Sequence, residues 1–253
     1  MVTGAASGIG RAIALALARE GADLCLIDLD EANLQLTAGA AKSLGVDVVT
    51  GVCDLSQPSA VKRASDLLLA SWDRLDILVN CAGICRYCAT DAMSEEHWNN
   101  IIAVNLLAPV QLTRTLLPLL AAQDEAHVVN VCSIYGLVSS VRVAAYQTSK
   151  FGLVGFSAAL QAEYGRPGFG VTALCPGFVR TPLIDKLHHD WASDGVRVPS
   201  WLGTSPDVVA ARTLKAIRRN KGLVVVTAYA RAIWWLARLS PGLAQWLAGK
   251  GLF

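Results

Sequence analysis

The sequence lacks the features that define several protein classes. No uncharged apolar run reaches the ~20 residues that a membrane-spanning helix needs. The chain begins directly with a glycine-rich turn, so we expect no signal peptide. Internal repeats, low-complexity tracts and linkers are absent, which favours a single domain over residues 1–253. The seven cysteines are an odd number, and we expect them to be reduced thiols of a cytoplasmic protein.

A large excess of charge is also missing. The formal net charge is +2, which is too small to indicate a nucleic-acid partner. The charges are unevenly distributed, because no acidic residue follows Asp207. The C-terminal part is therefore predicted to be cationic, with Arg212, Lys215, Arg218, Arg219, Lys221, Arg231, Arg238 and Lys250.

Apolar residues make up 53% of the chain and the mean hydropathy is +0.43, so a large core can be buried. Short β-rich runs alternate with longer helical patterns. This alternation predicts the α/β class, with a doubly wound parallel sheet flanked by helices. The expected strands end at Thr3 and cover 23–28, 46–50, 75–80, 127–132, 170–175 and 223–227; the expected helices follow Gly10 and cover 30–44, 57–72, 95–121, 144–164 and 206–219.

A glycine-rich turn, from Gly4 to Gly10, joins the first strand to the first helix. Glycines let the backbone approach a pyrophosphate, and the helix N-terminus adds free N–H groups and the positive end of its dipole. The next strand ends in Asp28, whose carboxylate is suited to bind both ribose hydroxyls of an adenosine and would repel a 2′-phosphate. The alternative role for Asp28 is to cap the next helix, but Asp30 suits that role better.

Other distinctive residues also follow strand ends. Ligands of doubly wound sheets bind at the carboxyl ends of the strands, so this convergence predicts one site. The residues concerned are Gly4 to Gly10, Asp28, Asp54, Leu55, Asn80 to Gly83, Ser133, Pro176 and Gly177.

The segment 133–150 carries groups suited to proton transfer. Tyr146 and Lys150 are four residues apart, which puts them on one face of a helix. A lysine ammonium lowers the tyrosine pKa from about 10, so that the phenol can exchange a proton with an alcohol or carbonyl oxygen. Ser133 can hydrogen-bond the same oxygen. Taken alone, the Tyr–Lys pair is more typical of a helix surface.

Together these motifs resemble the short-chain dehydrogenase/reductase family. The resemblance implies a Rossmann-like fold of about seven parallel strands and an NAD(P)-dependent oxidoreductase. Two departures are Cys81 in place of the family's second asparagine, and several residues fewer than usual before Thr3. The motifs run in order over residues 1 to about 227: TGAASGIG, NCAG, Asn105 in VNLL, Ser133, Tyr146-x-x-x-Lys150 and PGFVRT.

The resemblance also implies roles for individual residues. Tyr146 is the catalytic acid/base, and Lys150 lowers its pKa and holds the nicotinamide ribose. Ser133 orients the substrate oxygen, and Asn105 fixes a water of a proton relay. The implied cofactor set comprises Gly4, Ser7, Gly8, Ile9, Gly10, Asp28 and Leu29, then Asp54 and Leu55 at the adenine, Asn80, Ala82 and Gly83 on the adenosine ribose side, Val179 and Thr181 at the carboxamide, and Pro176, Gly177, Tyr146 and Lys150.

We expect NAD(H) rather than NADP(H). Asp28 repels a 2′-phosphate, and Ser7 stands where NADP-using relatives often carry a basic residue. The predicted reaction interconverts a secondary alcohol and a ketone. Two alternatives stay open: a catalytically idle cofactor-binding regulator or scaffold, and an epimerase or dehydratase on the same fold. The intact set of four catalytic residues argues against the first, and the second usually needs a more polar pocket.

Two patterns typical of metal sites are set aside. Cys81, Cys85 and Cys88 have the spacing of an iron–sulfur site, but Cys81 occupies a position in the cofactor loop. The adjacent His188 and His189, with Asp190, are more typical of a solvated loop. We therefore expect no metal.

Residues 183–203 lie where the family has its mobile substrate loop. Their apolar side chains predict an apolar pocket and a fairly hydrophobic secondary alcohol or ketone as substrate. The alternative is that they only pack a lid on the core. These side chains are Leu183, Ile184, Leu187, Trp191 and Trp201.

Residues 228–253 extend beyond the usual end of the family. Their apolar pattern, with Arg231 and Arg238, predicts an amphipathic helix that Pro241 breaks before a second short helix. We expect either a peripheral contact of residues 230–253 with anionic lipid, or helices that cover the core or a subunit contact. Helices like those at 95–121 and 144–164 pair between subunits in the family, so a homodimer or homotetramer is expected.

Overall fold

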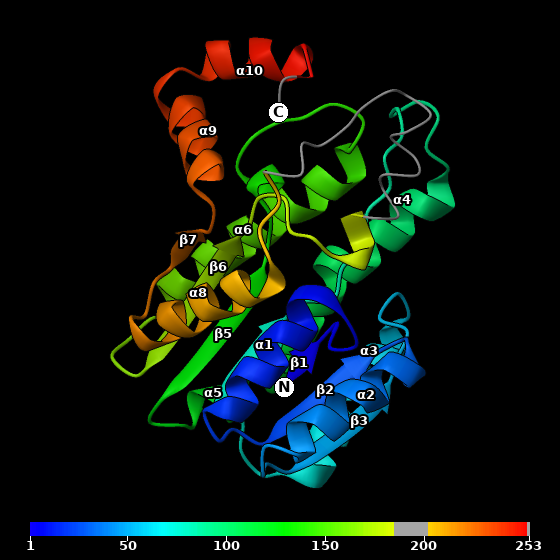
Figure 1. The fold of residues 1–253 in the computed structure, drawn as a ribbon, viewed down its shortest axis with the longest axis vertical. Coiled ribbons are helices and arrows are strands. Elements are labelled where there is room, and N and C mark those ends of the chain that lie inside the picture. The colour runs from blue at the N-terminus through cyan, green and yellow to red at the C-terminus, as the bar shows by residue number, and fades with distance from the viewer. Residues whose placement is uncertain (185–201, 252–253) are drawn as a thin grey trace.

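The computed structural model describes residues 1–184 and 202–251. Its strands are β1 (Val2–Thr3), β2 (Leu24–Asp28), β3 (Val48–Val52), β4 (Ile77–Asn80), β5 (Ala126–Val131), β6 (Phe169–Cys175) and β7 (Leu223–Val225). Within the described residues they form one parallel sheet in the order β3-β2-β1-β4-β5-β6-β7 (Figure 1). The predicted doubly wound sheet is confirmed, because the strand order reverses between β1 and β4.

Helices cover both faces of this sheet (Figure 1). The helices within the described residues are α1 (Gly8–Arg19), α2 (Glu31–Lys42), α3 (Pro58–Ser71), α4 (Glu95–Ile102), α5 (Ala108–Ala121), α6 (Ala144–Tyr164), α8 (Pro206–Arg218), α9 (Ala228–Leu239) and α10 (Pro241–Gly249), with short π and 3-10 segments η1 (Ala103–Leu107) and η2 (Ile134–Gly136). α1, α2 and α8 build the hydrophobic cluster on one face, and α3, α5 and α6 build the cluster on the other. The predicted helices are present, with ends shifted by at most three residues.

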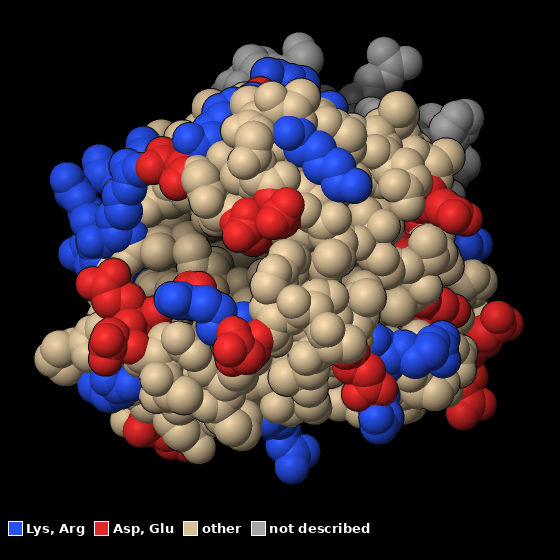
Figure 2. Space-filling view, turned by 90° about the horizontal axis from the view of Figure 1, so that it is seen from below, with Lys and Arg blue, Asp and Glu red and all other residues tan. Residues whose placement is uncertain are grey.

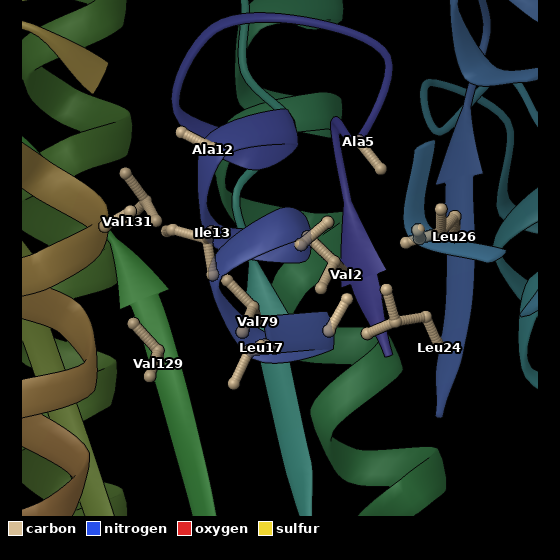
Figure 3. Close-up of a cluster of buried hydrophobic side chains, with 14 of the residues drawn as sticks. Val2, Ala5, Ala12, Ile13, Leu17, Leu24, Leu26, Val79, Val129 and Val131 are labelled. Carbon is tan, nitrogen blue, oxygen red and sulfur yellow. The ribbon is translucent and has the colours of Figure 1, made fainter. Parts of the chain in front are cut away.

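The core on the α1 face is built around the central strand (Figure 3). Val2 is fully buried, and it pairs with Leu26 of β2 on one side and Val79 of β4 on the other. Ile13 and Leu17 of α1 belong to the same cluster. Burial of each such side chain contributes about 1.5–3 kcal/mol. A strand of 2 residues can therefore hold the centre of the sheet.

The helix expected over 95–121 is interrupted by the π segment η1, which carries Asn105. By length and composition alone, Glu95–Ala121 is apolar enough to cross a membrane, with a mean hydropathy of 1.3. However, 44% of its most apolar window is buried. Leu112, Leu116 and Leu120 lie in the cluster on the α5 face. Glu95–Ala121 therefore packs as part of the core of this fold. Core helices can also be long and apolar enough to meet the length and composition criteria for a membrane span.

The two helices predicted after residue 228 are present. α9 ends at Leu239, and α10 begins at Pro241, the residue expected to separate them. Ile233 and Trp234 of α9 pack on a cluster that includes Ile134 and Leu153. One face of α9 therefore covers the core, which was one of the alternatives drawn from the sequence.

The basic residues of the C-terminal part do not form one surface. Arg218 and Arg219 precede β7 and so lie toward the amino ends of the strands, whereas Arg231 and Arg238 follow β7 and lie past the carboxyl ends. Figure 2, seen from below, shows Lys and Arg side chains gathered on the left, the side on which α8 ends in Figure 1. Arg218 forms an ion pair with Glu20 at 2.5 Å. The positive charge is thus divided between opposite ends of the sheet.

Candidate active site

The predicted site residues converge at the carboxyl ends of the strands. The centre of this edge lies between β1 and β4, where the strand order reverses and the following loops diverge. The glycine turn follows β1, Asp28 ends β2, Asp54 follows β3, Asn80 ends β4, Ser133 follows β5 and Pro176 follows β6.

The glycine turn fits closely against the loop after β4. Gly4 has φ +67° and Gly8 has φ +52°, both in the left-handed region that favours glycine. A Cβ on Gly4 would lie 2.8 Å from the backbone of Ala82, and a Cβ on Gly10 would overlap the Gly4 carbonyl. The Thr3 hydroxyl accepts hydrogen bonds from two N–H groups of the β4 loop at 3.0 and 3.1 Å. Glycines are therefore required here to bring two loops and a helix N-terminus together.

The N-terminus of α1 points its first N–H groups at this turn. Ser7 occupies the N-cap position in an extended conformation, and its side chain makes no capping hydrogen bond. Ile9 follows in the first turn and is partly buried. N–H groups that lack a side-chain cap suit an anion such as a pyrophosphate. This end of α1 fits the phosphates of a dinucleotide.

Asp28 is held beside the glycine turn by three backbone donors. Its Oδ2 accepts from Ala6 N at 2.8 Å, and its Oδ1 accepts from Leu29 N at 2.7 Å and Asp30 N at 3.1 Å. The N-cap of α2 is Asp30, which accepts from Asn33 N at 3.1 Å. Asp30 rather than Asp28 therefore caps α2, as expected. Asp28 remains a fixed negative charge next to the turn, which fits a ribose with free hydroxyls.

The residues expected around an adenine lie on the same edge. Leu29 is 65% exposed beside Asp28. Asp54 accepts a hydrogen bond from Ser56 N at 3.0 Å and so shapes the turn after β3. Leu55 is buried in the core cluster on the α3 face. Leu55 therefore contributes its backbone rather than its side chain to this edge.

The loop after β4 combines buried and site-facing residues. The Asn80 amide donates to Thr113 at 3.1 Å and to Asn130 at 2.8 Å, and Asn80 is almost fully buried. Its side chain thus links β4 to β5 and α5. Gly83 faces the site, because a Cβ there would lie 3.4 Å from Asn105 Oδ1 and 3.5 Å from Lys150 Nζ.

Tyr146 and Lys150 lie on one face of α6, as their spacing predicts. Lys150 Nζ donates to the Val131 carbonyl at 2.8 Å and lies 5.6 Å from the centroid of the Tyr146 ring. Tyr146 also shares a side-chain hydrogen bond with Ser133. Ser133 Oγ accepts from Tyr135 N at 3.1 Å, which fixes the serine at the start of η2. The structure therefore brings the three predicted catalytic side chains together.

Burial dominates the acid–base properties of this group. It raises the pKa of Tyr146 well above its ordinary value, and the hydrogen bond with Ser133 opposes this by a smaller amount. Burial also lowers the pKa of Lys150. From the sequence we expect Lys150 to lower the Tyr146 pKa. In the structure, desolvation is the largest influence on the pKa of both groups. The raised pKa favours the protonated phenol, which is the form that donates a proton.

Asn105 uses its whole side chain to fix the β4 loop. Its Oδ1 accepts from Ile84 N at 2.8 Å, and its Nδ2 donates to the Ile84 carbonyl at 2.8 Å. Nδ2 also lies 3.2 Å from Ser149 Oγ on α6. Asn105 is fully buried in the π segment, a type of helix distortion that is frequent at functional sites. Its side chain therefore joins α6 to the β4 loop, and only its backbone remains for a water relay.

The loop after β6 packs against the glycine turn at this edge of the sheet. The Pro176 carbonyl accepts from Ile134 N at 2.8 Å, and Val179 forms a bridge with Thr204. The Thr181 methyl lies against Gly8, where a Cβ would approach it to 3.0 Å. Gly177 faces Tyr229 of α9, a contact that no sequence motif indicated.

The cysteines contribute no metal cluster within residues 1–184 and 202–251. No group of three or more His, Cys, Asp or Glu side chains in these residues has the geometry to hold a metal ion. Cys81, Cys85 and Cys88 form no disulfide within the part of the chain that the structure describes. Other predictions lie outside the described residues: His188, His189, Asp190, Leu187, Trp191 and Trp201.

Comparisons with known proteins agree with this geometry. A family model described as short chain dehydrogenase matches residues 1–198. A D-beta-hydroxybutyrate dehydrogenase of Cupriavidus necator is 36% identical over 186 residues, which are 74% of this chain and 72% of that protein. A short chain dehydrogenase/reductase from Burkholderia phymatum in complex with NAD has a TM-score of 0.85 and 26% identity, covering 96% of this chain and 93% of its own.

A second solved structure carries the other nicotinamide cofactor. It is a putative NAD(P)-dependent gluconate 5-dehydrogenase from Beutenbergia cavernae with bound NADP, with a TM-score of 0.80 and 30% identity. It covers 91% of this chain and 95% of its own. The family match, the sheet and these relatives lead to one conclusion: this chain belongs to the short chain dehydrogenase family, a family of NAD(P)-dependent oxidoreductases.

Proposed function

We propose that this protein is an NAD(H)-dependent oxidoreductase that interconverts a secondary alcohol and a ketone, with Tyr146 as the acid/base. The observation that carries the proposal is the grouping of Ser133, Tyr146 and Lys150 on the strand edge that also holds the glycine turn and Asp28. The experiment that tests it is oxidation or reduction of an alcohol–ketone panel with NAD⁺ or NADH.

Each side chain has a distinct part in the proposed reaction. NAD(H) supplies the hydride chemistry when bound. Ser133 hydrogen-bonds the substrate oxygen and orients it toward the Tyr146 hydroxyl. In reduction the protonated Tyr146 phenol gives its proton to the ketone oxygen, and in oxidation the Tyr146 phenolate takes the proton of the alcohol hydroxyl. Lys150, anchored on the Val131 carbonyl, supplies positive charge beside the phenol and holds the nicotinamide ribose.

Asp28 is proposed to select NAD(H) over NADP(H). We expect the wild-type protein to bind NADH at least about tenfold more tightly than NADPH, since a 2′-phosphate would meet a fixed carboxylate. Asp28→Ala should reduce this preference by roughly tenfold. Titration of cofactor fluorescence on both proteins measures the two dissociation constants.

Asp30→Ala is the matched control for this test. It removes the neighbouring carboxylate and the N-cap of α2, at about 1 kcal/mol of stability, but leaves the charge beside the glycine turn in place. Its cofactor preference should equal that of the wild type. Tighter binding of NADPH than NADH by the wild-type protein would contradict the proposal.

The proposed substrate is a fairly hydrophobic secondary alcohol or ketone. Leu183 and Ile184, at the start of the segment after Thr181, are partly buried next to the site and support an apolar pocket. One relative is named for D-beta-hydroxybutyrate, so small hydroxy acids belong in the panel as polar comparators. Activity on charged hydrophilic substrates alone would contradict the apolar assignment.

We propose in addition a peripheral contact of residues 230–253 with anionic lipid. The outer face of α9 and α10 exposes Trp235, Leu239, Leu243 and Trp246 with Arg231, Arg238 and Lys250, a composition suited to a membrane interface. The wild-type protein should co-sediment with vesicles that contain anionic lipid, and more weakly with neutral vesicles. Equal sedimentation after deletion of residues 230–253 would contradict this contact.

The homodimer or homotetramer expected from the family resemblance stays a prediction. Leu107, the N-cap of α5, is 56% exposed, and Phe151 on α6 is 45% exposed. Large apolar side chains left uncovered on these two helices support a subunit contact there.

A further inference from the structure

The loop Pro176–Thr181 is in direct contact with the C-terminal extension. The Phe178 N–H donates a hydrogen bond to the Tyr229 hydroxyl. Any Cβ on Gly177 would overlap the same hydroxyl and ring, so glycine is required for the contact. The proposed chemistry assigns no role to Tyr229, which lies beyond the residues that the family model matches.

Three aromatic rings extend this contact to the catalytic serine. Phe178 stacks on Tyr229 with 6.3 Å between ring centroids and 16° between planes. Phe178 also meets Tyr135 edge-on, with 6.3 Å between ring centroids and 85° between planes. Tyr135 lies two residues after Ser133 and donates its N–H to the Ser133 hydroxyl. The rings therefore connect α9, the β6 loop and the segment that carries Ser133.

Two backbone hydrogen bonds with Thr204 also hold the β6 loop. The Phe178 carbonyl accepts from Thr204 N at 3.0 Å, and Arg180 N donates to the Thr204 carbonyl at 2.9 Å. Beyond this bridge, Thr181 rests against Gly8 of the glycine turn. Tyr229 and Thr204 thus both restrain Phe178, Tyr229 through the N–H of this residue and Thr204 through its carbonyl.

The helix that carries Tyr229 is itself firmly placed. Ala230 is fully buried, and Ile233 and Trp234 pack on the cluster that includes Ile134. A loop that is ordered before its ligand arrives pays less entropy on binding. Fixing Phe178 from a rigid helix therefore favours the loop conformation in which Val179 and Thr181 lie over the glycine turn.

We propose that Tyr229 is a positioning residue, which orders the loop Pro176–Thr181 so that the C-terminal extension becomes part of the cofactor site. This inference rests on the proposed function, since it assumes that the loop contacts the nicotinamide cofactor. It also gives α9 a role in addition to covering the core.

The test compares Tyr229→Phe with wild type. The phenylalanine keeps the ring stack and removes the hydroxyl that accepts from Phe178 N. The dissociation constant for NADH and the KM for the cofactor should each rise about fivefold, the effect of one hydrogen bond. The kcat at saturating cofactor should stay within about twofold. Tyr229→Ala, which also removes the stack, should raise the NADH dissociation constant by at least about tenfold.

The matched control is Tyr164→Phe, the same change on a tyrosine that is 39% exposed at the end of α6. It should leave NADH binding unchanged. If Tyr229→Phe lowers the unfolding temperature but leaves the NADH dissociation constant unchanged, Tyr229 has only a packing role and the inference is wrong. If the wild-type protein binds neither NADH nor NADPH, the proposed function fails, and the inference fails with it.

Discussion

Tyr146→Phe is expected to lower the rate of ketone reduction by about 10³-fold at saturating NADH, within the range of about 10²–10⁴ that general acid–base catalysis contributes. The phenylalanine ring keeps the packing on α6 but has no proton to give. NADH binding should change by less than about threefold, because the glycine turn and Asp28, which are proposed to hold most of the cofactor, are left intact. Stopped-flow hydride transfer and fluorescence titration measure the two quantities separately.

Tyr164→Phe on the same helix is again the control and should retain wild-type turnover. Tyr146 also shares a hydrogen bond with Ser133, so the variant should lose only about 1 kcal/mol of stability. A Tyr146→Phe protein that is folded, binds NADH and turns over at more than a tenth of the wild-type rate would contradict the assigned role of the phenol.

Gly10→Ala is expected to destabilise the protein by about 2–3 kcal/mol and to weaken NADH binding by at least tenfold. A Cβ at this position would overlap the Gly4 carbonyl oxygen, which is backbone and has little room to move. The glycine turn would have to shift, and with it the N–H groups that suit a pyrophosphate. Urea unfolding and NADH titration measure the two effects.

Gly39→Ala is the matched control, since Gly39 also lies in a helix and a Cβ there would meet nothing within 4 Å. Alanine in place of an exposed helical glycine should stabilise the protein by about 0.5–1 kcal/mol. Opposite signs for the two variants are therefore expected. Two variants with the same unfolding free energy would show that the close approach of Gly10 and Gly4 is not tight in solution.

Much of the fold was predictable because its signals are local. The alternation of β-rich runs and helical patterns predicted the sheet, and the four-residue spacing of Tyr146 and Lys150 predicted their shared face. The choice of Asp30 rather than Asp28 as N-cap was also local, because it depends on the distance from the start of the helix.

Other features depend on contacts between distant residues and could not be read from the sequence. Gly177 and Tyr229 meet only because α9 turns one face toward the end of β6. The direction of the Tyr146 pKa shift depends on how deeply the phenol is buried, and the spacing of Tyr146 and Lys150 in the sequence does not give that burial. The separation of Arg218 from Arg238 follows from β7 running between them, and a count of charges along the chain does not contain this separation.

The most direct test of the proposed function is the initial rate of the wild-type protein with NAD⁺ and NADP⁺ on a panel of secondary alcohols, from short alkanols to sterols, with small hydroxy acids as polar comparators. The account predicts turnover of at least one apolar alcohol, faster with NAD⁺ than with NADP⁺. Tight binding of NADH without turnover of any alcohol, or of the matching ketones in reverse, would contradict it and would favour a catalytically idle, cofactor-binding protein.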